Sequence, residues 1–185
     1  MDLAELKEAG IRALSDSLLS SIGFIDSLRE QGYNKVAFIR LDLLVKRNMP
    51  REQVDDYLTH LRSVIRRQQG AFMHCLGLIR TSPIQEEEEY RIQCVLIFDS
   101  EQVRHYIQRG NEVGRHWVNI ITEGQGSYFN YNSYRQRGPG SGYGIVSLVA
   151  MRWKWHMLLL AMGSEDHPLI LIGIPRQEAK DSDRD

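Results

Sequence analysis

The chain has 185 residues, a formal net charge of −1 at pH 7, and hydrophobic and charged fractions of 42% and 25%. This length is enough for one globular domain with its own core and is short for two independent domains. The near-neutral charge excludes the strongly basic composition of many nucleic-acid-binding proteins, so any affinity for nucleic acid must come from local patches.

Segments that would attach the chain to a membrane are not indicated. The longest apolar run, MLLLAM at residues 157–162, is far too short to span a bilayer. The first ten residues are acidic and do not resemble a signal peptide, and two cysteines do not make a disulfide framework. We therefore expect a cytoplasmic protein without a membrane partner, in which Cys75 and Cys94 are buried thiols.

The first half of the chain predicts helix, strand and helix. Apolar residues such as Leu14, Leu18 and Ile22 recur at helical spacing, so residues 1–30 are expected to contain one or two helices. Residues 35–45, KVAFIRLDLLV, are rich in β-branched and apolar residues without a helical period, which predicts a buried strand. Residues 50–69 begin with a proline, suited to a first helical turn, and carry an apolar stripe at helical spacing.

The second half predicts two paired strands followed by more helix. Residues 72–81 and 90–98 read as strands, and the short loop between them indicates a hairpin. Ser100 is the expected N-cap of a helix that carries Val103 and Tyr106, with a further helical stretch around Trp117. Residues 122–144 form a polar segment rich in Gly, Tyr and Asn, residues 147–162 predict a helix, and residues 168–174 predict a short strand.

This order of elements predicts an α+β fold. Its middle follows the split βαββα, ferredoxin-like arrangement, in which helices pack on one face of an antiparallel or mixed sheet. Additional helices are expected at the N-terminal and C-terminal sides. The predicted organisation is an N-terminal helical segment at residues 1–30, an α+β domain at residues 31–175 and a disordered tail at residues 176–185. Such a sheet leaves its second face for a ligand or another part of the chain.

Two stretches resemble a known family. VAFIRLDLLV at residues 36–45 contains an Arg, hydrophobic, Asp, Leu core, and EVGRHWVNIITEGQGSYFNYNSYRQRGPGSGYGIV at residues 112–146 contains a Gly, two residues and a Trp, then Thr, Gly and Gly. An Asn-rich stretch and a Gly-rich turn follow. In this order, over residues 35–167, the chain resembles the inovirus-type replication initiators, a branch of the HUH rolling-circle Rep proteins of phages, plasmids and integrated elements.

The resemblance implies a Rep-like fold and a nuclease that binds a DNA origin, cuts one strand with a tyrosine and holds a divalent metal on paired histidines. The positions that correspond to these histidines carry Arg91 and Gln93. The acidic position of the family falls near Thr81, the opening strand carries Asp42, and the helix that should offer the tyrosine reads WKWHMLLLAM. Because arginine cannot ligate a metal and glutamine replaces imidazole poorly, we interpret Asp42, Thr81, Arg91 and Gln93 as a degenerate former site. No metal, cofactor or catalytic residue is expected there.

Two other segments predict a binding surface. The helix at residues 50–69 has a positive group that suits phosphate contacts, made of Arg51, Arg62, Arg66 and Arg67. The polar segment adds two arginines suited to phosphates, Arg135 and Arg137, and four aromatic residues suited to bases or to a protein partner, Tyr128, Phe129, Tyr131 and Tyr134. Both segments also have plainer interpretations, a solvated helix face and a connection fixed by its own aromatics.

The remaining motifs are less specific. The four glutamates Glu86–Glu89 could gather a cation, imitate a phosphate backbone or form a solvated turn. The histidines show none of the spacings of metal sites, and His74 and Cys75 are neighbours on a predicted strand, so their side chains point to opposite faces.

The leading hypothesis is a catalytically degenerate Rep-like protein of a mobile element that binds nucleic acid, DNA first. A second hypothesis is a protein-binding anti-defence factor, such as an anti-CRISPR-like inhibitor of a host protein–nucleic acid complex. A third is an active rolling-circle nuclease whose ligands the alignment misplaces; if a metal were bound, Asp42, His74 and Asp99 would be the alternative ligands. The sequence does not define a nucleic-acid sequence preference or an oligomeric state.

Overall fold

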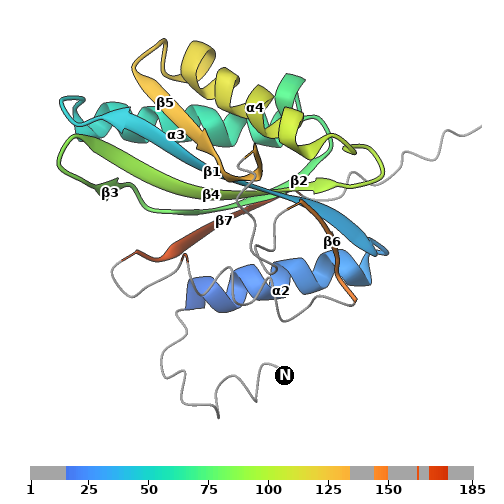
Figure 1. Ribbon diagram of the computed structural model, residues 1–185. Helices are drawn as coiled ribbons and strands as arrows, with labels where there is room; N and C mark the ends of the chain where they lie inside the picture. Colours follow the sequence, from blue (N-terminus) through green and yellow to red (C-terminus); the bar gives the residue numbers. More distant parts are fainter. Residues whose placement is uncertain (1–15, 134–143, 150–161, 163–166, 175–185) are drawn as a thin grey trace, which may run out of the picture.

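A computed structural model describes residues 16–133, 144–149, 162 and 167–174 of the chain (Figure 1). Its helices and strands, in chain order, are α2 (Asp16–Glu30), β1 (Lys35–Lys46), α3 (Arg51–Arg67), η1 (Gly70–Phe72), β2 (Cys75–Thr81), β3 (Ile84–Gln85), β4 (Glu89–Asp99), α4 (Tyr106–His116), η2 (Trp117–Ile121), β5 (Gly126–Asn130), η3 (Tyr131–Ser133), β6 (Gly144–Ser147) and β7 (Leu169–Gly173). The α+β class predicted from the sequence is confirmed. Among the described residues, no helix combines the length and the apolar character needed to cross a membrane.

The described strands form one seven-stranded sheet in which every pairing is antiparallel. The order is β5-β1-β4-β2-β7, with β3 paired to β4 and β6 paired to β1. The three predicted strands lie together at the centre as β1, β4 and β2, so their placement in one sheet is confirmed. The predicted hairpin also forms, and β3 is an additional short strand between its two arms.

Helices α3 and α4 cover one face of the sheet (Figure 1). The apolar stripe of α3, which includes Val54, Leu61 and Ile65, packs into the same buried cluster as Ile39 and Leu96 of the sheet. The predicted packing of this helix on the three strands is therefore confirmed. Packing of this apolar face contributes most of the stability of such a helix, and intrinsic helix propensity contributes less.

Helix α2 covers the opposite face (Figure 1), which the sequence left unassigned. Ile22 and Ile25 pack with Phe38, Val95 and other sheet residues in a second buried cluster. Residues 1–30 were predicted as an N-terminal helical segment, and residues 16–30 share a core with the sheet. Helix α2 packs so closely on β2 that only glycine fits at position 77, because a Cβ there would lie 2.7 Å from the Phe24 ring.

Two local predictions are wrong. Ser100 does not cap a helix: its hydroxyl donates to the Lys35 carbonyl at 2.9 Å, and α4 begins only at Tyr106. The polar segment at residues 122–144 is not a loop throughout, since Gly126–Asn130 forms strand β5 along β1. The alternation of polar and aromatic residues in this short strand lacks the apolar run that identified the central strands.

Several predictions fall outside the described residues. The tail at residues 176–185 is one of them. Most of the predicted helix at residues 147–162 is another, although Ser147 itself belongs to β6. The predicted strand at residues 168–174 is confirmed as β7.

The glycine and tryptophan motif of residues 114–126 connects α4, β5 and β1. The Trp117 ring is fully buried, lies 6.3 Å from the Tyr57 ring and donates its Nε1–H to the Leu44 carbonyl at 3.2 Å. A Cβ at Gly114 would lie 2.2 Å from the Tyr128 ring, so only glycine lets α4 approach β5 so closely. The motif that carries the family resemblance therefore has a packing role in this fold.

Candidate functional site

Polar side chains gather on the sheet face that also carries α2, beside the apolar cluster under that helix. Asp42 lies on this face because it is four residues from Phe38, and alternate residues of a strand share a face. We call this group the Asp42 cluster. Its members are Asp42, Thr81, Glu86, Arg91, Gln93 and Tyr131.

The centre of the cluster is an ion pair between β1 and β4. The Asp42 side chain is only 1% exposed, and its Oδ2 accepts a hydrogen bond from Arg91 Nη1 at 2.9 Å. Arg91 also donates Nε and Nη2 to the two carboxylate oxygens of Glu86, at 2.8 and 2.9 Å. The hydrogen bonds to Glu86, and after them the interactions with Asp42, raise the pKa of the Arg91 guanidinium above its ordinary value. Two carboxylates thus hold Arg91 as a cation.

Tyr131 closes the cluster from the residues that follow β5. Its hydroxyl donates to Asp42 Oδ2 at 2.8 Å, and the Arg40 guanidinium lies 4.5 Å from its ring centroid. Burial, and then the hydrogen bond to Asp42, raise the pKa of the Tyr131 hydroxyl. A tyrosine in this state is a poor nucleophile, because its phenolate form is disfavoured. Asp42 Oδ1 is also buried and has no hydrogen-bond partner among the described residues.

The former-site prediction is geometrically coherent. Asp42 is the register partner of Gln93, and the backbone N–H of Gln93 donates to the Thr81 hydroxyl at 3.1 Å. The structure therefore brings all four predicted positions, Asp42, Thr81, Arg91 and Gln93, into one region of the sheet. Glu86 is a member that the sequence did not assign, since the glutamate run was interpreted as a whole. The available signal in the sequence for this ion pair was that Glu86 precedes Arg91 by five residues at a predicted hairpin turn.

The chemistry of the cluster is that of a structural ion-pair network. Asp42 and Glu86 both face Arg91, so a metal ion would have to displace a bound guanidinium. Within the described part of the chain, no group of three or more His, Cys, Asp and Glu residues is arranged to hold a metal ion. The alternative ligands Asp42, His74 and Asp99 do not lie together. Asp99 lies next to His74 and pairs with Val36 of β1. Val36 is six residues from Asp42 along the strand, which is a distance of roughly 20 Å.

The predicted phosphate-binding arginines of α3 are exposed but do not form one patch. Arg51, Arg62 and Arg66 lie on one flank of the helix, because their spacing of eleven and four residues returns to the same side at 3.6 residues per turn. Arg67 lies about 100° away from Arg66. Asp55 lies on the arginine flank and pairs with Arg51 at 3.5 Å, where both side chains are at least half exposed. This flank therefore carries three arginines and one carboxylate.

The predicted partner-binding aromatics are mostly packed within the protein. Tyr128 packs against the main core beside Gly114, and Tyr131 belongs to the Asp42 cluster. Phe129 is 39% exposed and contacts the Tyr131 ring edge-to-face at 4.8 Å. Three of the predicted residues, Tyr134, Arg135 and Arg137, lie outside the described residues. The tyrosines at 128 and 131 thus act as packing residues, which matches the plainer interpretation of this segment.

The asparagines of the same segment also fix the backbone. Asn132 is buried, donates to the Phe38 carbonyl at 3.0 Å and accepts from the Arg40 N–H at 2.9 Å, which continues the pairing of β1 beyond the end of β5. Asn130 donates to Asn111 Oδ1 and to the Ile107 carbonyl of α4, at 2.9 and 3.1 Å. The Asn-rich stretch of the family resemblance therefore connects the sheet to α4.

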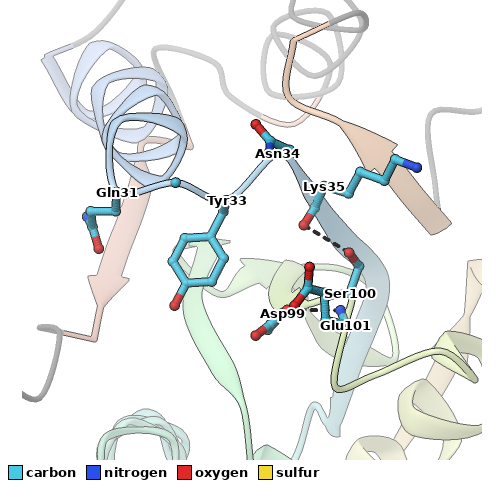
Figure 2. A pocket seen from close by; sticks show the side chains of 8 residues that line it. Gln31, Tyr33, Asn34, Lys35, Asp99, Ser100 and Glu101 are labelled. Carbon is cyan, nitrogen blue, oxygen red and sulfur yellow. Dashed lines mark hydrogen bonds between the residues drawn. The ribbon is translucent and has the colours of Figure 1, made fainter. Parts of the chain in front are cut away.

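A separate cavity of about 470 Å³ lies at the opposite end of β1, between the end of α2 and the end of β4. Figure 2 shows Tyr33 and Asp99 beside the hollow, while the Lys35 ammonium points away from it. The Asp99 carboxylate accepts from the Glu101 N–H at 2.9 Å. Of the residues named in the sequence analysis as candidate ligands or binding residues, Asp99 lines this cavity.

Comparisons of the chain with protein-family models, with curated proteins and with solved structures find no match.

Proposed function

We propose that this protein is a catalytically degenerate, Rep-like protein of a mobile genetic element that binds DNA without forming a covalent bond. The observation that carries the proposal is the flank of α3 on which Arg51, Arg62 and Arg66 are all exposed. Arginine forms bidentate hydrogen bonds with phosphate, and a row of exposed arginines along a helix suits the spacing of a nucleic-acid backbone.

The topology supports the Rep-like part of the proposal. Elements β1, α3, β2, β4, α4 and β5 follow the βαββαβ order, and four of their strands lie in the spatial order β5-β1-β4-β2 with both helices on one face. This order of elements agrees with the split βαβ arrangement expected for ferredoxin-like domains and so supports the proposal. Helix α2 and strands β6 and β7 are additions to it.

The Asp42 cluster supports the loss of nuclease chemistry. Arg91 occupies the strand position at which the resemblance requires a metal-binding histidine, and it is held there by Asp42 and Glu86. Tyr131, which shares the Asp42 carboxylate with Arg91, donates a hydrogen bond to that buried carboxylate and has a raised pKa. Both observations oppose strand cleavage.

The second hypothesis, a protein that binds a host protein through its aromatic residues, has less exposed surface to support it. Of its four aromatic residues, Tyr128 and Tyr131 contribute to packing, and Phe129 is the exposed one among those described. An aromatic anchor must be available to a partner to contribute binding energy. We therefore favour nucleic acid as the partner.

Fluorescence anisotropy with labelled single-stranded and duplex DNA of about twenty nucleotides tests the proposal. We expect binding that weakens steeply between about 50 and about 200 mM salt, because phosphate contacts release condensed counterions. The double variant Arg62→Glu/Arg66→Glu should reduce affinity at least about tenfold, since repulsion replaces two contacts. The matched control is Arg104→Glu/Arg115→Glu, which makes the same charge change at exposed positions next to and on α4. Undetectable binding at low salt would reject the DNA-binding function.

A second assay tests the absence of cleavage. Supercoiled and single-stranded DNA are incubated with the protein and Mg²⁺ or Mn²⁺, and the products are separated on denaturing gels. We expect neither nicked product nor a protein–DNA adduct. An adduct that forms with the natural chain and disappears with Tyr131→Phe would show that the site is active.

A further inference from the structure

Arg80 is a charged residue within an otherwise apolar strand of the sheet. It lies on β2, and its register partners are Cys94 of β4 and Ile170 of β7. Cys94 belongs to the buried cluster under α3, so Arg80 lies on the α3 face of the sheet. A guanidinium at such a position needs negatively charged or hydrogen-bonding partners, because burial of an unpaired cation is costly.

The protein supplies few of these partners. Among the described residues, Arg80 makes one hydrogen bond, from Nη1 to the Thr81 carbonyl at 3.0 Å. Its Nε is buried and has no acceptor. Since a guanidinium has five N–H donors, most of the donor capacity of Arg80 remains unused.

The charges around Arg80 are mainly positive. Arg51 reaches the end of β2, with its Nη1 3.5 Å from the Pro83 carbonyl oxygen, and Arg62 lies on the same flank of α3. Burial lowers the pKa of the Arg80 guanidinium. Cys94 and Asp55 act in the opposite direction, and Arg51 and Arg62 lower the pKa by smaller amounts. Asp55 is also paired with Arg51. The charged groups that act on Arg80 are thus two guanidinium groups and one carboxylate, and that carboxylate is paired with Arg51.

We propose that Arg80, Arg51 and Arg62 form a binding site for a phosphate group between β2 and α3, and that a phosphate of the nucleic-acid backbone occupies it. A phosphate oxygen accepts from the unused donors of Arg80 and neutralises the excess of positive charge. The identity of the phosphate carrier rests on the proposed DNA-binding function. The site itself rests on the hydrogen bonding and charge of Arg80.

The variant Arg80→Gln tests the site in the same anisotropy assay. Loss of one phosphate contact should weaken DNA binding about fivefold at low salt and reduce the slope of log affinity against log salt by about one. The control variant Arg115→Gln removes one charge from an exposed position of α4 and should change affinity less than about twofold. DNA binding that is equal in Arg80→Gln and the natural chain would overturn the site while leaving the proposed function intact.

A direct probe follows the Nε–H resonance of Arg80 by NMR, assigned through its disappearance in Arg80→Gln. Titration with the oligonucleotide should shift this resonance at the concentrations that give binding in anisotropy. A shift with inorganic pyrophosphate in a protein that does not bind DNA would overturn the nucleic-acid source and assign the site to a free phosphate ligand. Absence of a shift with both ligands would overturn the site.

Thermal stability separates a ligand site from a packing role. In phosphate buffer, compared with chloride of equal ionic strength, the natural chain should melt about 2 °C higher, because a ligand that binds only the folded state stabilises it. Arg80→Gln should lose this increase and retain its melting temperature in chloride. A lower melting temperature in chloride together with an unchanged phosphate effect would show that Arg80 only supports the fold.

Discussion

Arg91 Nη1 lies 2.9 Å from Asp42 Oδ2, across the central pair of strands β1 and β4. The same carboxylate oxygen accepts from the Tyr131 hydroxyl, and the same guanidinium binds Glu86. These contacts join two strands, the turn before β4 and the residues after β5, which are as many as 89 positions apart in sequence. The ion pair thus helps to hold together segments that are distant in sequence.

The first prediction concerns the stability of this pair. Arg91→Met should lower the free energy of unfolding at neutral pH by about 2 to 3 kcal/mol, because it leaves the buried Asp42 carboxylate without its cation. This is below the usual cost for a fully buried pair, since the Arg91 side chain is 31% exposed. Urea denaturation followed by circular dichroism measures the change.

A control and a double variant complete this experiment. Glu89→Gln removes a partly exposed carboxylate 3.5 Å from Arg91 and should cost less than about 0.5 kcal/mol. Asp42→Asn combined with Arg91→Met removes both charges, so the double variant should be less destabilised than the sum of the single variants. Additive effects would show that the two residues do not interact.

The sequence predicted the central fold because local patterns determine it. Apolar runs identified β1, β2 and β4, and the helical stripe identified α3. Strand β5 was missed because Gly126–Asn130 is short and polar, and its pairing depends on β1, which lies more than eighty residues away. The position of α2 likewise depends on contacts with Phe38 and Val95, which no local pattern contains.

The site was predictable in part. Asp42, Thr81, Arg91 and Gln93 were grouped through the resemblance, and the strand register brings them together. Their mutual contacts were not predictable, because the hydrogen bond of Tyr131 to Asp42 and the role of Glu86 arise from tertiary packing. Arg80 carried a visible signal, an arginine within the strand CLGLIRT, but its unused donors appear only in three dimensions.

The second prediction compares two neighbouring aromatics. Tyr128→Ala should destabilise the fold by about 2 kcal/mol, since its ring packs against Gly114 and the main core, and truncation leaves a cavity. Phe129→Ala, at a more exposed position, should cost less than about 1 kcal/mol. The same urea titration measures both variants. Equal and small effects would mean that Tyr128 is free to act as a binding residue.

The third prediction concerns the two buried cysteines. Burial raises the pKa of both thiols, Cys75 and Cys94, to about 12, from an ordinary value of 9.0. Neither should react with a thiol reagent near pH 8 in the folded protein, and both should react in denaturant, because the thiolate is the reactive form. The unfolded chain releases these protons at lower pH than the folded chain. The stability that they contribute is therefore present below about pH 9 and lost as the pH rises toward 12. Rapid reaction of one thiol in the folded protein would contradict the burial.

The last prediction uses two adjacent arginines of α3 as a matched pair. Arg66→Glu and Arg67→Glu make the same charge change in the same helical turn, but the side chains lie about 100° apart. Arg66 shares its flank with Arg51 and Arg62, whereas Arg67 lies on the side of His60. This side faces α4, because His60 is close enough to His116 of α4 to lower the pKa of His116, after the larger effect of burial. If the flank of Arg51, Arg62 and Arg66 follows the phosphate backbone, Arg66→Glu should weaken DNA binding about five- to tenfold and Arg67→Glu less than about twofold. Anisotropy at low salt measures both affinities, and circular dichroism checks that both variants fold. Equal losses would indicate a nonspecific attraction to the whole positive end of the helix, and a larger loss with Arg67→Glu would place the DNA between α3 and α4 instead.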